Sequence, residues 1–121
     1  MTDTLIAWSP SSYGQADGAP IRLLEASGVD VRPNPFGRRL TADEAKEHLK
    51  GVHGLIAGLE PLTRDVLESA PSLRAIARVG IGVDNIDHEA ASELGITISN
   101  TPEAPAESVA ELTLAAALSL L

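Results

Sequence analysis

The sequence predicts an α/β fold built around one parallel sheet. Apolar segments of strand length alternate with segments of helical periodicity, and turn-forming Gly, Pro, Asn and Ser residues separate them. One strand segment, residues 54–57, is apolar throughout, which is typical of a strand buried on both faces of a parallel sheet. Such alternation favours right-handed crossovers, so we expect the turns after the strands to gather at one edge of the sheet.

The expected elements have recognisable beginnings and ends. The five expected strands are residues 4–8, 29–32, 54–57, 73–79 and 96–99. The expected helices are residues 20–27, 41–50, 64–69, 87–94 and a C-terminal segment that starts at 106. Thr41 and Glu44 have the spacing of a capping box, and Thr63 and Asp87 stand at N-cap positions. Gly95 is placed where a helix ends in the left-handed conformation.

Composition limits the classes of function. A chain of 121 residues is long enough for one domain with its own core, and its 44% hydrophobic and 21% charged residues are typical of a soluble globular protein. The absence of cysteine excludes thiol chemistry and agrees with a cytoplasmic location. A net charge of −8 argues against nucleic acid and anionic membranes as partners. We expect neither a membrane span nor a secretory signal.

The glycine-rich turn that begins at Gly80 and Gly82 is not a dinucleotide-binding fingerprint. Asn85 occupies the position where that fingerprint has its third glycine, and no acidic ribose partner follows at the expected distance. The chain also contains no Walker motif. The two glycines allow a tight turn or a close approach of the backbone to a ligand, and the residues alone leave both interpretations open.

Three groups of motifs give the chain a resemblance to a known family. They are RVGIGVDNID at 78–87 with NTP at 100–102 and SVAEL at 108–112, NPFGRRLT at 34–41, and GLIAGLEPLT at 54–63. At these spacings the chain resembles the D-isomer-specific 2-hydroxyacid dehydrogenases, in particular their phosphoglycerate dehydrogenase-like branch. The resemblance covers nearly the whole chain but only the first segment of such an enzyme. It implies a flavodoxin-like five-stranded parallel sheet of order 2-1-3-4-5, with helices on both faces.

The resemblance also implies how the chain is divided. Residues 1–105 would form a substrate-binding domain, and residues 106–121 the truncated start of an interdomain helix. The nucleotide-binding domain would be absent from this chain. Because the segment from 106 is apolar on most sides, we expect it to fold back onto the sheet or to pair with a second copy. The parent enzyme is expected to be a homodimer.

Two turns carry the site residues that the resemblance implies. Backbone amides there would hold the carboxylate and the 2-oxygen of a substrate. The substrate-binding residues by matching position are Gly58, Leu59, Glu60, Arg78, Val79 and Gly80. The residues that would face the nicotinamide are Ile81, Asn100 and Thr101. The residues alone also allow a simpler interpretation, in which the glycines form ordinary tight turns and Arg78 is a surface arginine.

Other polar residues are assigned structural roles. Asp84 and Asn85 are expected to hold their own turn through hydrogen bonds to their own backbone. Ser9 is expected to lie in a solvated loop after the first strand. We expect no metal site, because the three histidines do not share the spacing of metal ligands and each is expected to be solvated. They are His48, His53 and His88. We assign no catalytic residue, because the arginine, acid and histidine of such enzymes would lie beyond Leu121.

The function that follows is the substrate-binding part of an NAD-dependent oxidoreductase. The parent would act on a small D-2-hydroxy or 2-oxo acid with NAD(H) as its cofactor. This chain alone is expected to be inactive and not to bind the cofactor tightly. The alternative is a free-standing flavodoxin-like module that binds a ligand or partner without catalysis. The sequence argues against a phosphorelay receiver as this module, because Gly58 stands where the phosphoacceptor aspartate is expected.

Overall fold

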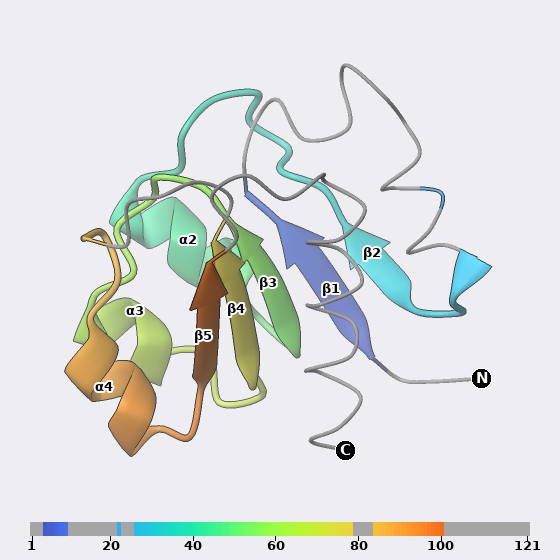
Figure 1. Cartoon of the computed structure of the whole chain (residues 1–121). Coiled ribbons are helices and arrows are strands. Elements are labelled where there is room, and N and C mark those ends of the chain that lie inside the picture. The colour runs from blue at the N-terminus through green and yellow to red at the C-terminus, as the bar shows by residue number, and fades with distance from the viewer. Residues whose placement is uncertain (1–3, 10–21, 23–25, 79–83, 101–121) are drawn as a thin grey trace.

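A computed structural model of the chain describes residues 4–9, 22, 26–78 and 84–100. Five parallel strands form one sheet of order β2-β1-β3-β4-β5 (Figure 1). The strands are β1 (Leu5–Trp8), β2 (Asp30–Arg32), β3 (Gly54–Ala57), β4 (Ala75–Arg78) and β5 (Thr97–Asn100). The predicted sheet and its strand order are confirmed. β3 has the expected bounds, β1 and β2 begin one residue later than expected, β4 is shorter at both ends, and β5 begins and ends one residue later.

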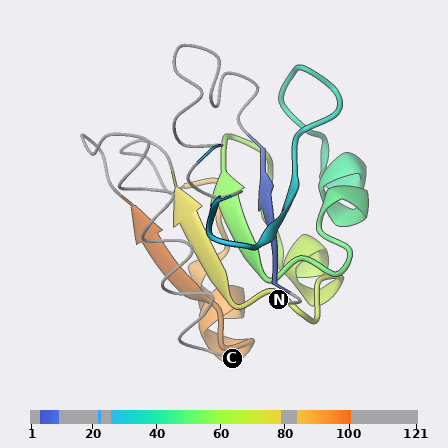
Figure 2. The ribbon, with the colours of Figure 1, turned by 90° about the vertical axis from the view of Figure 1, so that its right-hand side faces the viewer.

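Three helices pack against one face of this sheet, as Figures 1 and 2 show. They are α2 (Ala42–His48), α3 (Arg64–Glu68) and α4 (His88–Glu93). One strand face and the helices form a single apolar cluster. Its members include Ala7, Leu55, Ile76, Ala45, Leu49, Val66, Leu67, Ala90 and Ala91. The alternate strand residues Ile6, Ile56 and Ala77 are also buried. The expected helices at residues 20–27 and 106–121 lie almost wholly outside the described residues.

The helix ends follow their capping residues. The Thr41 hydroxyl accepts a hydrogen bond from the Glu44 amide at 3.3 Å, and the Glu44 carboxylate accepts one from the Thr41 amide at 2.9 Å, so the predicted capping box is confirmed. Thr63 and Asp87 cap α3 and α4 without such a box, since each side chain accepts one hydrogen bond, from the amides of Val66 and Ala90. Gly95 follows α4 with a φ of +75°, as predicted.

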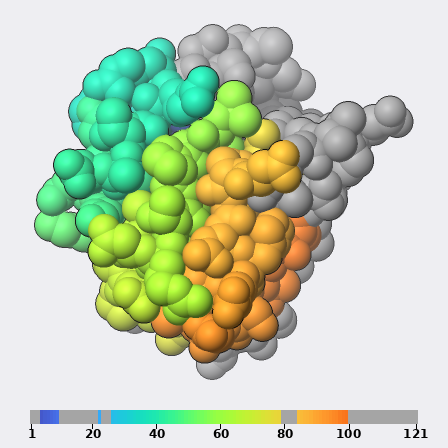
Figure 3. Space-filling model, turned by 90° about the vertical axis from the view of Figure 1, so that its left-hand side faces the viewer, coloured from blue at the N-terminus to red at the C-terminus, as the bar shows by residue number. Residues whose placement is uncertain are grey.

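The three helices also form a continuous outer surface (Figure 3). Lys46 of α2 pairs with Asp65 of α3, and the Arg64 guanidinium of α3 lies 2.6 Å from the Glu93 carboxylate of α4. These ion pairs are exposed, so each stabilises the fold only slightly. Within the described part of the chain, no helix has the length and apolar character needed to cross a membrane.

The expectation that all three histidines are solvated is wrong for two of them. His48 is buried, and its Nε2 lies 3.0 Å from the Trp8 carbonyl oxygen at the end of β1. His53 is half-buried, and its Nδ1 accepts a hydrogen bond from the Leu5 amide. Both rings satisfy main-chain groups at the two ends of β1, which a buried strand requires. His88 is exposed, as expected.

Candidate functional site

The candidate site lies where the strand order reverses. β2 lies on one side of β1 and β3 on the other, so the carboxyl ends of β1 and β3 flank the point where open α/β sheets bind ligands. Ser9 follows β1, and its amide donates to the Ile56 carbonyl at 2.9 Å, which extends the pairing of the two strands. Residues 58–61, here called the β3 turn, follow β3. Arg78 ends the neighbouring strand β4.

Glu60 places a carboxyl group inside this site. It is 1% exposed, and its Oε1 accepts a hydrogen bond from the Gly58 amide at 2.9 Å. Burial raises the pKa of the Glu60 carboxyl, while the nearby Ser9 hydroxyl, the amides of the turn and the charge of Arg78 act in the opposite direction. Neither Glu60 Oε2 nor the buried Ser9 hydroxyl completes a hydrogen bond with a described residue. Buried polar atoms with incomplete hydrogen bonds at a strand switch point are typical of a functional site.

Asn85 connects the β3 turn to the segment before α4. Its Nδ2 donates to the carbonyl oxygens of Gly58 at 3.1 Å and Glu60 at 2.8 Å. Asn85 was predicted to bond its own turn, but both hydrogens of its side-chain amide are used on another segment of the chain. The physical reason is that two buried carbonyl groups of another segment need donors, and the Asn85 amide carries two hydrogens. Asp84, its neighbour, is exposed.

The backbone of the same segment completes the connection. The Leu62 amide donates to the Asn85 carbonyl at 2.8 Å, and the Asp87 amide donates to the Leu62 carbonyl at 3.0 Å. Leu62 and Ile86 form an isolated parallel bridge and are both buried. The β3 turn is thus fixed to the beginning of α4 by main chain and side chain together.

These bonds determine which amide of the β3 turn remains available. The Gly58 amide is taken by the Glu60 carboxylate, the Glu60 amide acts on its own carboxyl group, and residue 61 is a proline without an N–H. The chain has no cis peptide among the described residues, so the Leu59 N–H points away from the Gly58 carbonyl that Asn85 holds. Within the described ranges no group accepts a hydrogen bond from the Leu59 N–H, and the residue is 56% exposed.

The structure brings together four of the predicted substrate-binding residues. Gly58, Leu59 and Glu60 form the β3 turn, and Arg78 lies close enough to affect the Glu60 carboxyl. Arg78 is 6% exposed, so its interpretation as a surface arginine is wrong. Asn100 lies opposite Arg78 in the parallel pairing of β5 with β4, at the end of both strands. The remaining predicted residues, Val79, Gly80, Ile81 and Thr101, lie outside the described residues.

Sequence reasoning missed two contributors to the site. Ser9 was expected in a solvated loop but is 3% exposed beside Glu60. Its position directly after a strand at the switch point was the available signal. Asn85 was assigned to its own turn, and nothing in its sequence neighbourhood indicates that it reaches 25 and 27 residues back along the chain. In the described segments, no three His, Cys, Asp or Glu side chains are grouped as a metal ion would require.

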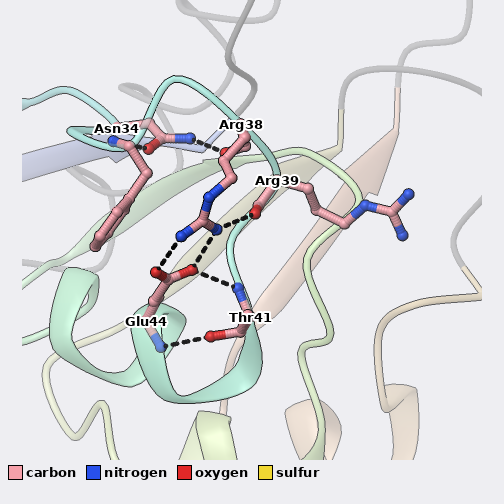
Figure 4. Close-up of polar contacts among 6 residues, drawn as sticks. Asn34, Arg38, Arg39, Thr41 and Glu44 are labelled. Atoms are coloured by element: carbon pink, nitrogen blue, oxygen red, sulfur yellow. Dashed lines mark hydrogen bonds and ion pairs between the residues drawn. The ribbon is translucent and has the colours of Figure 1, made fainter.

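The NPFGRRLT loop next to α2 has a different character (Figure 4). Arg38 holds the Glu44 carboxylate with two hydrogen bonds of 2.7 Å and lies 5.2 Å from the centre of the Phe36 ring. The Arg38 hydrogen bonds and the Thr41 amide lower the pKa of the Glu44 carboxyl to about 2. The Arg39 side chain points away from this cluster. Arg38 is therefore occupied within the protein.

Comparison with known proteins assigns the family. The model of the D-isomer specific 2-hydroxyacid dehydrogenase catalytic domain matches residues 15–118, which is most of the chain. The chain belongs to this family. The D-3-phosphoglycerate dehydrogenase of Methanocaldococcus jannaschii is 48% identical over 97 residues, which are 78% of this chain. The hydroxypyruvate reductase of Thermotoga maritima is 50% identical over 76 residues, 62% of this chain and 25% of that protein.

A solved structure supports the fold. The NAD+-bound 3-phosphoglycerate dehydrogenase of Entamoeba histolytica superposes with a TM-score of 0.71 at 24% identity, over 84% of this chain and 33% of that one. The phosphoglycerate dehydrogenase-like resemblance of the sequence is confirmed. The chain covers only a small part of the length of these relatives. Its match spans 17% of the Methanocaldococcus protein.

Proposed function

We propose that this chain forms the substrate-binding part of an NAD-dependent dehydrogenase that acts on a small D-2-hydroxy acid. The observation that carries the proposal is the Leu59 N–H at the switch point, which no described group accepts, next to the buried Glu60 and close to the buried Arg78. The names of the relatives, D-3-phosphoglycerate dehydrogenase and hydroxypyruvate reductase, support a hydroxy acid as the substrate class.

In this proposal the substrate carboxylate accepts a hydrogen bond from the Leu59 amide. The Gly58 amide joins only if the Glu60 carboxylate, which now holds it at 2.9 Å, moves aside. Arg78 supplies positive charge near the end of β4 and offsets the negative charge of Glu60. The amides of Val79 and Gly80 are proposed to contact the same substrate. Together these groups would orient the C2 atom, which contributes to catalysis by fixing the reacting geometry.

The coenzyme would be held mainly outside this chain. The sequence lacks the glycine-rich fingerprint that binds the pyrophosphate, and the residues that we propose to face the nicotinamide are Ile81, Asn100 and Thr101. When bound, NAD would accept the hydride from C2 of the hydroxy acid. We also propose that the acid–base residues come from the rest of the parent. Accordingly, residues 1–105 would be the substrate-binding unit, 106–121 would lead toward the nucleotide-binding domain, and this chain alone would be inactive.

The test uses the whole protein that contains this chain and the 121-residue chain in parallel. NADH oxidation is followed with glyoxylate, pyruvate, hydroxypyruvate and phosphohydroxypyruvate. We expect the whole protein to reduce at least one of these acids and the shorter chain to reduce none. Calorimetric titration of the shorter chain with oxalate should show binding without turnover. If the whole protein binds oxalate but oxidises NADH with none of these acids, the dehydrogenase proposal is wrong and the non-catalytic module takes its place.

A further inference from the structure

The peptide unit between Gly58 and Leu59 is held from one side by a single side chain. Asn85 Nδ2 donates to the Gly58 carbonyl at 3.1 Å and to the Glu60 carbonyl at 2.8 Å, so the two held carbonyls flank Leu59. The Asn85 amide has only these two hydrogens to donate. Both are used on the β3 turn, and Asn85 is half-buried.

The position of Asn85 is itself fixed. Its carbonyl accepts from the Leu62 amide at 2.8 Å, and the buried Leu62 and Ile86 bridge the two segments. The side-chain amide therefore reaches the turn from an anchored backbone. A donor placed in this way holds a carbonyl in one direction with little further loss of side-chain entropy.

Gly58 makes this restraint necessary. A peptide unit that follows a glycine can rotate more easily, because glycine has no Cβ to restrict its backbone angles. Rotation of this unit would exchange the directions of the Gly58 carbonyl and the Leu59 N–H, since the two groups point to opposite sides of one planar peptide. Glu60 holds the Gly58 amide, but that group belongs to the preceding peptide unit and does not prevent the rotation.

We propose that Asn85 is a positioning residue for ligand binding, which fixes the Gly58–Leu59 peptide so that the Leu59 N–H faces the ligand. The inference rests on the proposed function, because it takes the carboxylate of a 2-oxo acid as the ligand. Asn85 touches neither the ligand nor the reacting atoms. It acts through the direction of one backbone amide.

The test is Asn85→Ala in the whole protein, with steady-state kinetics for a 2-oxo acid and for NADH. Loss of one directed hydrogen bond to a charged ligand should raise the KM of the 2-oxo acid about tenfold. The KM of NADH should stay within about twofold, since the restraint acts on the acid and not on the coenzyme. A general loss of structure would instead lower the amount of active enzyme and leave the KM of the acid unchanged.

Arg32→Ala is the matched control. Arg32 Nη1 also bridges two main-chain carbonyls, those of His48 at 2.9 Å and Lys50 at 2.7 Å, but it joins β2 to the end of α2 and not to the β3 turn. We expect this variant to lower the melting temperature and to leave both KM values within about twofold. If Asn85→Ala does not fold, Asn85→Ser serves instead, because one hydroxyl donor can hold one of the two carbonyls. Its KM for the acid should then rise severalfold.

The outcomes separate the two proposals. If the unmodified protein reduces no 2-oxo acid, the proposed function fails and this inference fails with it. If the unmodified protein is active and a folded Asn85 variant keeps its KM for the acid within twofold, only the positioning role is wrong. An equal rise in the KM of NADH also contradicts it. A selective rise in the KM of the acid supports it.

Discussion

Two segments that follow strands of the sheet are each held by an asparagine side chain that donates to two main-chain carbonyls, but they differ in how their charged groups are paired. In the α2 segment, residues 34–48, the Asn34 amide bridges two carbonyls, Arg38 pairs fully with Glu44, and the charges lie at the surface. In the β3 turn the Asn85 amide also bridges two carbonyls, but the carboxylate of Glu60 is buried and one of its oxygens lacks a hydrogen bond among the described residues.

This difference in hydrogen bonding indicates which of the two segments serves the stability of the fold and which is the candidate for binding a ligand. Polar groups that are already paired gain little by binding a ligand, so the contacts of Asn34, Arg38 and Glu44 in the α2 segment are best explained by folding. Buried polar groups that are left incomplete lower stability, and proteins retain them where function requires it. The β3 turn therefore remains the better candidate for the ligand, although the NPFGRRLT motif contains more positive charge.

The largest stability effect is expected at His48, which joins α2 to the end of β1. His48→Leu would remove the hydrogen bond that His48 donates to the Trp8 carbonyl and the packing of its buried ring, so we expect a loss of about 2 kcal/mol near pH 8. Burial, together with the charge of Arg32, lowers the pKa of His48, despite the opposing effect of the hydrogen bond that His48 donates to the Trp8 carbonyl. Wild-type stability should thus fall as the pH drops below about 6.5, where the unfolded chain takes up a proton and the folded one resists it.

The stability difference between wild type and His48→Leu should therefore shrink between pH 7.5 and pH 5. Urea unfolding at a series of pH values measures it. His88→Gln, at an exposed histidine, should change stability by less than about 0.5 kcal/mol. A difference that grows on acidification would contradict the assignment of His48 as a buried neutral donor.

Glu60 and Glu44 provide an intermediate test, because their pKa values are displaced in opposite directions. The folded pKa of Glu60 is raised, so its contribution to stability is complete below about pH 4.5 and is lost as the pH rises through the folded pKa. The folded pKa of Glu44 is about 2, so its contribution is present above about pH 4.5 and is lost as the pH falls toward 2.

Two isosteric variants, Glu60→Gln and Glu44→Gln, test these opposite pH dependences of stability. Relative to wild type, Glu60→Gln should become more stable as the pH rises from 4 to 7. Glu44→Gln should be least stable relative to wild type at pH 7 and should approach wild type near pH 2. Thermal melts of the three proteins across this range provide the measurement. Parallel pH profiles for the two variants would mean that the carboxyl groups do not differ in environment as described.

The sequence predicts the sheet better than the site, and the residues show why. Local rules act within a few positions, so Thr41 with Glu44, Asp87 and Gly95 define helix ends correctly. The sheet order came from the family motifs, since alternation alone does not distinguish the possible orders. Asn85 and Ser9 were misjudged because their partners lie far away in sequence. No local pattern shows that a turn has two carbonyls to satisfy.

The smallest expected effect distinguishes the two arginines of the NPFGRRLT motif. Arg38→Ala removes two charge-assisted hydrogen bonds to Glu44 and the contact with Phe36, and it should lower the melting temperature measurably at pH 7. Arg39→Ala should change it by less than about 1 °C, because the Arg39 side chain is exposed and points away from Glu44 (Figure 4). The effect of Arg38→Ala should diminish as the pH falls toward 2, because the Glu44 carboxylate becomes protonated over this range in the wild type. If both variants melt alike, the pairing of Arg38 does not stabilise this segment, and either arginine is then open to an anionic ligand. If they differ as expected, only Arg39 retains a guanidinium that such a ligand can use.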